Sequence, residues 1–216
     1  MRGSRRGAEV HVTVTNMKKG PRRYRKGARA ESERRTRRSI LEAAVDCFQR
    51  DAYDRVTIAE IAARSGLTVQ TILRIYGNKD ALFVAAVRSI AANLIERRND
   101  VPPDDLHDGL AVLADDYRKW GDVHEQLSLR SKHLPELAAL LEEWRIQHRH
   151  WVCRIFATAL EPLNARTRRQ TIALLVVALG IETYRRLRAE RLSHSATTQA
   201  MRHLTEVVLG RLTVKS

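Results

Sequence analysis

The stretch ILEAAVDCFQRDAYDRVTIAEIAARSGLTVQTILRIYGNKDALFVAAV, residues 40–87, decides the fold. Its first part has apolar residues at positions 40, 41, 44, 45 and 48, the spacing of an amphipathic helix with one buried face. We therefore predict a first helix that starts near residue 36 and ends at residues 51–54, which have an aspartate at each end. Asn78 caps a later and longer helix that runs to Arg98.

Two short helices lie between these longer ones. Thr57 followed by Glu60 is the capping-box pattern that begins a helix. Gly66 provides the left-handed conformation that a tight turn after this helix requires. Thr68 then caps a third helix over Val69–Ile75. Two short helices joined by a turn that contains glycine, behind a supporting helix, predict a helix-turn-helix.

The second short helix carries the side chains that this motif would present to DNA. A helix-turn-helix places that helix in the major groove, where its N-terminal residues meet base edges. Gln70 can pair with adenine through two hydrogen bonds, and Arg74 suits guanine or a phosphate. The other side chains at this end are Thr68, Val69 and Thr71. The alternative is a plain three-helix packing unit with a polar exposed face.

Residues 40–87 resemble the N-terminal signature of the TetR family of transcription regulators. The matching residues are Phe48, Ala52-Tyr53, Thr57-Ile58, Ile61-Ala62, Ser65-Gly66-Leu67-Thr68, Tyr76 and Asn78-Lys79-Asp80-Ala81-Leu82. The resemblance implies an all-α protein, with a helix-turn-helix DNA-binding domain over residues 36–83 and a helical ligand-binding and dimerisation domain over residues 84–216. It also implies a homodimer that represses transcription at a palindromic operator in double-stranded DNA until a small-molecule effector releases it.

The resemblance also assigns residues to DNA contacts. It implies that Thr57 and Thr68 contact the DNA backbone and that Lys79 binds a phosphate. It places Gln70, Thr71 and Arg74 in or beside the groove, and Val69 and Tyr76 are further candidates for DNA contacts. This chain departs from the family pattern by having Val69, Leu73 and Ile75 where Lys, Tyr, and His or Tyr are frequent. All three changes remove polar groups, which puts the affinity for each half-site and the operator sequence in doubt.

The net charge of +14 is concentrated at the N-terminus. Residues 1–35 hold twelve basic and three acidic residues and almost no large apolar side chains. Such a segment cannot bury enough surface to offset its loss of conformational entropy, so we predict a disordered basic arm. Two interpretations stay open. The arm contacts DNA phosphates or the minor groove, or it is a solubilising tail or the product of a start codon assigned too early.

The C-terminal part of the chain has helical patterns without a comparable motif. The predicted helices are Asp104–Trp120, Val123–Ser131, Pro135–Leu160, Thr167–Leu192 and Ala196–Leu212. In TetR-family relatives the last two helices pair with their copies as a four-helix bundle. Ile172–Ile181 is apolar nearly all round, as a helix covered on both sides must be. The alternative is the ordinary core of a monomer.

The helix predicted over Pro135–Leu160 carries one apolar stripe at three- and four-residue steps. Its members are Leu137, Leu141, Trp144, His148, Trp151 and Ile155. In relatives this helix lines the effector cavity, so we expect Trp144, His148 and Trp151 to lie there. The further candidates for the ligand pocket are Tyr117, Trp120, Arg130 and Tyr184. Buried aromatic side chains with a few polar groups describe a small-molecule pocket and equally describe core packing.

Other classes of protein find no support in the sequence. There is no Gly-rich phosphate loop, nucleophile elbow or paired-His zinc motif, so we expect no enzyme, no cofactor and no metal site. Cys47 and Cys153 lie in apolar helical patterns and predict buried, reduced thiols in a cytoplasmic protein. The longest apolar run is half a membrane span, which predicts no membrane partner. A basic architectural protein that binds DNA without sequence preference is the remaining alternative.

Overall fold

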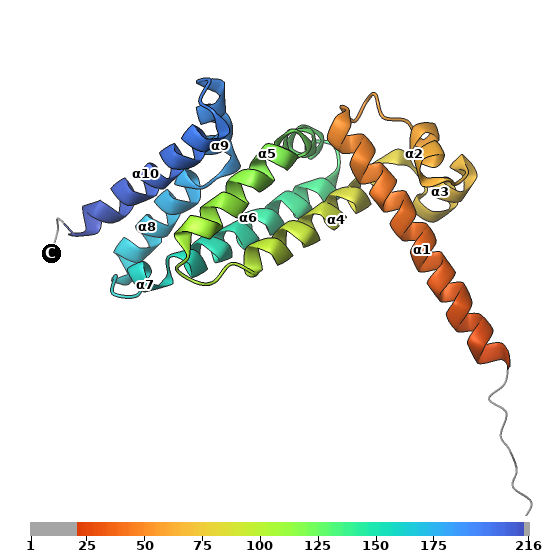
Figure 1. Ribbon diagram of the computed structural model, residues 1–216, viewed down its shortest axis with the longest axis horizontal. Coiled ribbons are helices and arrows are strands. Elements are labelled where there is room, and N and C mark those ends of the chain that lie inside the picture. Colours follow the sequence, from red (N-terminus) through yellow and green to blue (C-terminus); the bar gives the residue numbers. More distant parts are fainter. Residues whose placement is uncertain (1–20, 214–216) are drawn as a thin grey trace, which may run out of the picture. The chain divides into compact units, whose positions relative to one another are not determined.

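The computed structural model of the chain describes the backbone of residues 21–213 and the side chains of residue 27 and residues 29–210. All regular structure in this range is α-helical, which confirms the predicted fold class (Figure 1). The chain divides into two units, residues 1–38 and residues 39–216. The helices are α1 (Pro21–Arg50), α2 (Ile58–Ser65), α3 (Val69–Tyr76), α4 (Lys79–Asn99), α5 (Leu106–Arg130), α6 (Pro135–Ile155), α7 (Ala157–Leu160), α8 (Ala165–Ala178), α9 (Ile181–Ala189) and α10 (His194–Thr213).

The first unit contains the start of α1, which begins at Pro21 and not near residue 36. The predicted disorder is therefore wrong for residues 21–35, while residues 1–20 of the predicted arm lie outside the described residues. The segment holds six arginines, two alanines and two glutamates, which favour helix. It continues the same helix as residues 39–50, so no new helix has to be nucleated. Two ion pairs about one turn apart support it, Glu31 with Arg34 at 3.3 Å and Glu33 with Arg37 at 3.0 Å.

In the second unit, a first hydrophobic core joins the end of α1 to α2, α3 and α4. Phe48, Tyr53 and Phe83 meet at its centre, with the ring centroid of Phe83 4.8 Å from that of Phe48 and 5.1 Å from that of Tyr53. The core continues into α5 and α6 through Val123, Leu127, Leu137 and Leu140. The helix-turn-helix region and the helices that follow it therefore share buried contacts.

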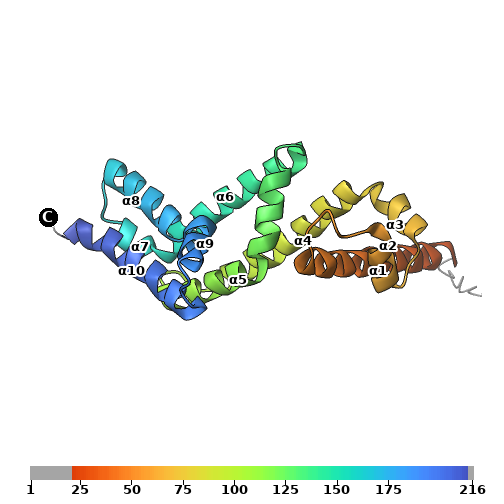
Figure 2. The ribbon, with the colours of Figure 1, turned by 90° about the horizontal axis from the view of Figure 1, so that it is seen from above.

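A second core lies among α5, α6, α8, α9 and α10. In both ribbon views α10 lies beside α8 and α9 (Figures 1 and 2), and α4 packs against α5 and α6. Cys47 is a buried free thiol in the first core, as predicted, whereas Cys153 is only half-buried because it lies at the edge of the second. Within residues 21–213, no helix is both long enough and apolar enough to cross a membrane.

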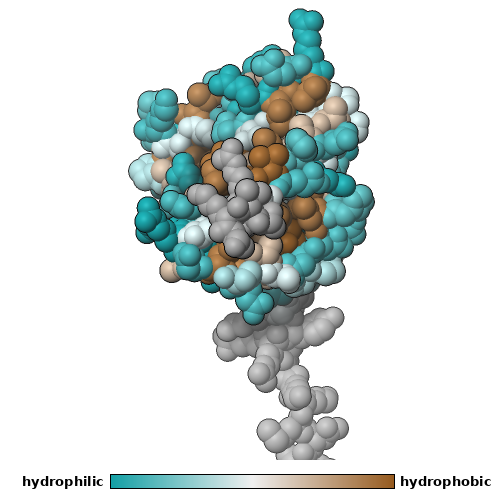
Figure 3. Space-filling model, turned by 90° about the vertical axis from the view of Figure 1, so that its left-hand side faces the viewer, coloured by the Kyte–Doolittle hydropathy of each residue, from teal (hydrophilic) through white to brown (hydrophobic). Residues whose placement is uncertain are grey.

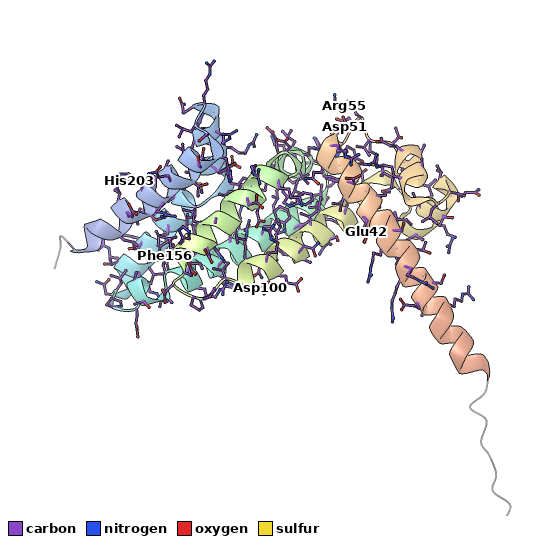
Figure 4. The ribbon with its side chains drawn as sticks, in the orientation of Figure 1. Glu42, Asp51, Arg55, Asp100, Phe156 and His203 are labelled. Carbon is purple, nitrogen blue, oxygen red and sulfur yellow. The ribbon has the colours of Figure 1, made fainter. Side chains whose placement is uncertain are left out.

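Two predicted helix boundaries differ from the structure because packing overrides local sequence. The helices predicted over Asp104–Trp120 and Val123–Ser131 form one continuous helix, α5. Gly121 in its middle costs about 1 kcal/mol relative to alanine, but buried residues on both sides of it hold the helix together. The helix predicted over Pro135–Leu160 ends earlier, because the chain turns at Phe156 between α6 and α7 (Figure 4).

The helix predicted over Thr167–Leu192 is also divided, between α8 and α9. Gly180 at this break has extended backbone angles, and a Cβ atom there would lie 3.2 Å from the carbonyl oxygen of Val176. The hydroxyl of Tyr117 donates a hydrogen bond of 2.9 Å to the carbonyl oxygen of Leu179. This hydrogen bond satisfies the carbonyl oxygen of Leu179 where α8 ends. The helix can therefore stop inside the protein without leaving a buried polar atom unpaired.

Candidate nucleic-acid interface and cavity

The caps of the two short helices are those that the sequence predicts. The side-chain oxygen of Thr57 accepts a hydrogen bond of 3.1 Å from the backbone N–H of Glu60, and that of Thr68 accepts one of 3.1 Å from the N–H of Thr71. Gly66 between the helices has a φ of +68°, which glycine adopts without steric cost. The order of cap, short helix, glycine turn, cap and short helix confirms the helix-turn-helix.

The second short helix, α3, buries one face and exposes the other. Ile72 is 1% exposed and faces the first core. Gln70 and Arg74 lie one turn apart and are both exposed. Val69 and Leu73, which are 39% and 38% exposed, lie beside them. The exposed face thus combines an amide, a guanidinium and two apolar groups, which are the chemical groups that read base edges in a major groove.

The other predicted DNA contacts lie around this face. Thr57 and Thr68 are exposed at the starts of α2 and α3, and the hydroxyl of Thr71 lies 2.9 Å from that of Thr68. Tyr76 is half-buried at the end of α3. The ammonium of Lys79, in the first turn of α4, lies 4.2 Å from the ring centroid of Tyr53, and partial burial lowers the pKa of Lys79. No sequence pattern indicated this last contact.

Arg130 does not line the cavity for which it was predicted. It lies in the last turn of α5 and donates hydrogen bonds of 3.2 Å to Asp80 and 3.3 Å to Asp54. Its guanidinium also covers the ring of Tyr53, whose hydroxyl donates to Asp80 at 2.5 Å. Burial, followed by this hydrogen bond, raises the pKa of Tyr53. The partners of Arg130 belong to other elements of the fold, so helical spacing within α5 could not reveal them.

A cavity of about 510 Å³ lies among α4, α5, α6 and the junction of α8 with α9. Small-molecule sites span about 300–1,000 Å³, so this cavity has the volume of such a site. Five of the seven predicted pocket residues line it, namely Tyr117, Trp120, Trp144, His148 and Trp151. Tyr184, like Arg130, does not. Its ring is 4% exposed and packs on Tyr117, and its hydroxyl lies 3.0 Å from Nδ1 of His194.

One buried ion pair borders the cavity. Asp116 on α5 has no exposed side-chain surface, and its carboxylate accepts hydrogen bonds of 2.9 Å from Arg98 and 2.8 Å from Arg97. Burial raises the pKa of Asp116, while the two guanidinium groups oppose that rise. A carboxylate in this position is stable only with its partners, because an unpaired buried charge is strongly unfavourable. The end of α4 is thereby fixed to α5 beside the cavity.

Burial disfavours the charged form of two histidines in the cavity wall. Burial, followed by the nearby positive charge of Arg98, lowers the pKa of His148 to about 4. Burial also lowers the pKa of His124. His148 stacks on Trp151 and His124 stacks on Trp144, each pair with ring centroids 5.9 Å apart. The wall is therefore planar, aromatic and neutral at these positions.

Sequence reasoning missed the part of the cavity wall that α4 supplies. Ile90, Leu94 and Arg98 lie one turn apart on this helix and all border the cavity. Their four-residue spacing was a usable signal, but a stripe in one helix does not indicate whether it faces a core or a cavity. Among residues 21–213, no three His, Cys, Asp or Glu side chains are grouped so that they could hold a metal ion.

The chain is similar to known regulatory proteins. Residues 40–86 match the family described as bacterial regulatory proteins, tetR family. The HTH-type transcriptional repressor AcnR of Corynebacterium efficiens is 24% identical over 174 residues, which cover 80% of this chain and 90% of that protein.

Solved structures with the same fold are more distant in sequence. A transcriptional regulator from Rhodococcus sp. Rha1 is 15% identical, with a TM-score of 0.62 over 81% of this chain and 96% of that one. A tetR-family transcriptional regulator from Streptomyces coelicolor is 21% identical, with a TM-score of 0.56 over 78% and 80% of the two chains. Together with the helix-turn-helix geometry, these likenesses show that residues 40–86 form a DNA-binding region of the tetR type and that most of the chain has the fold of known transcriptional regulators.

Proposed function

We propose that this chain is a transcriptional regulator of the TetR family, a homodimeric repressor that binds a palindromic operator and dissociates from it when a small molecule enters the cavity. One observation carries the proposal. The first turn of α4 follows directly on α3, and the second half of the same helix lines the cavity through Ile90, Leu94 and Arg98. A ligand that shifts the end of α4 can therefore change the position of α3. The similar protein AcnR is named a transcriptional repressor, which supports repression of transcription over its activation.

The DNA contacts follow from the exposed face of α3. Gln70 pairs with an adenine, and Arg74 binds a guanine or a phosphate. Val69 packs on a thymine methyl group, and Thr71 lies beside it in the groove. Thr57, Thr68, Tyr76 and Lys79 bind the DNA backbone around this helix. Because phosphate contacts position the protein and base contacts specify the sequence, Gln70 carries most of the discrimination.

The dimer forms through α8 and α10. These packed helices expose four large apolar side chains, Leu174 and Val177 on α8 and Leu204 and Val207 on α10. Figure 3 looks onto this end of the molecule and shows several apolar groups on its surface. Each Å² of apolar surface removed from water contributes about 25 cal/mol, so a second copy that covers this face is favourable. Two copies also supply two recognition helices, which a palindrome requires.

Release by a ligand is an equilibrium between two conformations. A small molecule weakens operator binding only if it binds the conformation that is unfit for DNA more tightly than the other. The coupling is reciprocal, so the operator must weaken binding of the ligand by the same factor. In this protein α4 and the Arg98–Asp116 pair connect the two sites.

The experiment that tests the proposal is selection of bound sequences from random duplex DNA with the full chain. We expect a palindromic consensus with two half-sites about one helical turn apart, or a multiple of that distance. Gln70→Ala should shift or blur the consensus at one position in each half. If random duplex binds as tightly as any selected sequence at the same salt concentration, the chain is an architectural protein and the proposal fails.

A further inference from the structure

The first part of α1, residues 21–38, has no buried face among its described side chains, and we call it the basic extension. The side chains of residues 29–35, 37 and 38 are exposed, and Thr36 is half-buried. Among the described side chains of α1, that of Ile40 is the first to be buried. A helix that packs on a core has an apolar stripe at three- and four-residue steps, and the basic extension has none.

Local interactions hold the basic extension only weakly. Its two ion pairs, Glu31 with Arg34 and Glu33 with Arg37, join side chains that are 48–76% exposed. Exposed pairs of this kind add little to the stability of a helix, and Gly27 in the helix interior lowers it. A helix that is polar on all sides is stable only with many such pairs or with a partner. A partner surface would therefore complete this part of α1.

Half of the net charge of the chain lies in the basic extension. Residues 21–38 hold nine Lys or Arg and two Glu, which is +7 of the total of +14. Residues 39–216 hold 25 basic and 22 acidic residues, so their net charge is only +3. The charge is thus concentrated on a short helix with exposed side chains, which attracts anions.

Several of these cations are available to a partner. Arg29, Arg35 and Arg38 are exposed and form no ion pair with any residue that the structure describes. Arg22 and Lys26 precede Arg29 by seven and three positions, so the three positions share one face of the helix. Arg35 and Arg38 lie on other faces. The basic extension therefore suits an extended anionic surface better than a single bound anion.

The composition of the basic extension disfavours a membrane or a protein groove as its partner. A helix that lies in a membrane surface buries an apolar face, and one that docks in a protein groove needs apolar anchors at three- and four-residue steps. Tyr24 is the only large apolar or aromatic residue in residues 21–38. Attraction between charges is thus the main interaction that the helix offers. Duplex DNA, with one negative charge for about each 1.7 Å of its axis, matches it.

The helical form of the basic extension limits where it can lie on a duplex. An α-helix is about 10–12 Å across with its side chains, whereas the minor groove is about 6 Å wide. Residues 21–38 also lack Asn and Gln, the side chains that pair with adenine through two hydrogen bonds. As a helix they extend over about 27 Å, which is enough to contact several phosphates.

We propose that the basic extension is a second DNA-binding element, an α-helix that lies along the phosphate backbone of duplex DNA and binds it without preference for base sequence. It adds affinity for every duplex and leaves discrimination among sequences to α3. The proposal rests on the proposed function only in that the chain binds DNA, and it needs neither the operator, nor the dimer, nor a small-molecule ligand.

The first experiment compares two triple variants of the full chain with the unaltered chain on random duplex DNA. One variant removes three cations from the basic extension, through Arg29→Gln, Arg35→Gln and Arg38→Gln. The matched control removes three exposed arginines from α6, α8 and α9, through Arg149→Gln, Arg166→Gln and Arg186→Gln. Circular dichroism and sedimentation check that both variants keep the fold and the assembly of the unaltered chain.

Anisotropy titrations at several salt concentrations give the slope of log affinity against log salt. Each phosphate contact contributes about 0.9 to this slope, so the extension variant should have a slope shallower by about 2.7 for each bound chain. Between 50 mM and 200 mM salt, the unaltered chain should then lose about 40-fold more affinity for each bound chain than this variant. The control variant should keep the slope of the unaltered chain.

A proline in the basic extension tests whether the helix itself is the form that binds. Ala30→Pro removes a backbone hydrogen bond and breaks the helix without changing the charge. Ala30 is exposed, so Ala30→Gln is the matched control that keeps the helix. We expect Ala30→Pro to bind random duplex more weakly and with a shallower salt slope, while Ala30→Gln should leave both unchanged.

The outcomes separate this proposal from its alternatives. An unchanged slope in the extension variant, or an equal change in the control variant, overturns the proposed phosphate contacts. Unchanged binding by Ala30→Pro overturns the helical form. A loss of affinity for the selected operator but not for random duplex would indicate base reading and contradict the proposal. If the extension variant keeps its DNA slope but loses binding to phosphatidylserine vesicles that the unaltered chain shows, the partner is a membrane.

The same titrations judge the proposed function separately. If the unaltered chain and both triple variants prefer the selected operator to random duplex, operator recognition stands, whatever the basic extension does. If the slope depends on the basic extension but no chain prefers the operator, the second DNA-binding element is upheld and the proposed operator-specific repression fails.

Discussion

The guanidinium of Arg130 lies over the ring of Tyr53, with its Cζ atom 3.5 Å from the ring centroid. This contact connects the last turn of α5 to the loop between α1 and α2, and Asp80 in the first turn of α4 binds both side chains. Ser128 and Ser131, on either side of Arg130 in the chain, border the cavity. The end of α5 therefore contacts both the helix-turn-helix region and the cavity.

Removing this contact should destabilise the protein. In Arg130→Ala we expect the free energy of unfolding to fall by about 1–2 kcal/mol, from the loss of a partly buried cation–π contact and two ion pairs. Urea denaturation measures the change. Arg118→Ala, on the same helix, removes an exposed pair with Asp115 only and should alter stability by less than about 0.5 kcal/mol. If both variants lost the same free energy of unfolding, the contact between Arg130 and Tyr53 would add nothing to stability.

Gln70 and Lys79 should contribute differently to DNA binding: we expect Gln70 to read a base and Lys79 to bind a phosphate. Gln70→Ala should lose about 1–3 kcal/mol of discrimination at one base position in each half-site. Lys79→Ala should weaken binding to all duplexes alike and make the dependence of affinity on salt less steep. Anisotropy titrations with the selected operator, its single-base variants and random duplex measure both effects. A uniform loss in both variants would mean that α3 does not read bases.

The local features of the DNA-binding region could be predicted from sequence because they are properties of a few neighbouring residues. Thr57, Gly66 and Thr68 act through their own backbone angles and hydrogen bonds within three residues. The helical state of residues 21–35 was missed because composition was weighed as a sign of disorder, although Glu–Arg spacing favoured a helix.

Features that depend on distant partners could not be predicted in the same way. The cavity row of Trp144, His148 and Trp151 was visible as helical spacing, but spacing alone does not tell a cavity wall from a core. Arg130 and Tyr184 were assigned to the pocket for their chemistry, whereas their positions are set by Asp80 and by Tyr117 in other helices. The break at Gly180 likewise depends on a hydroxyl group 63 positions earlier in the chain, that of Tyr117.

The exposed apolar face of α8 and α10 should control assembly. Val177 is 66% exposed, so Val177→Glu should leave the fold of one chain intact while it places a charge in the proposed interface. Sedimentation at micromolar concentration should show a dimer for the unaltered chain and a monomer for this variant. Ile146→Glu is the control, since Ile146 is an exposed apolar residue on α6, and its dimer should persist. A dimer in both variants would place the interface elsewhere.

Acid should destabilise the protein through His148. Its pKa is about 4 in the folded chain and about 6.5 when unfolded, so the unfolded state binds more protons between these values. Stability is therefore unaffected by this group above pH 6.5 and is lost as the pH falls towards 4, by about 3 kcal/mol in total for a shift of this size. Denaturation of the unaltered chain and His148→Leu from pH 7 to pH 4 should show a steeper loss for the unaltered chain. Parallel curves would mean that the imidazole is not held in its neutral form.

Binding of a palindrome with one half scrambled tests the central claim most directly. The selected operator and a duplex of the same length and composition with one scrambled half-site are titrated at one fixed salt concentration. If two copies of α3 read two half-sites, scrambling several base pairs at about 1–3 kcal/mol each should raise the dissociation constant at least about 100-fold. An unchanged dissociation constant would contradict the account, because a single recognition helix or the phosphate backbone alone would then explain binding.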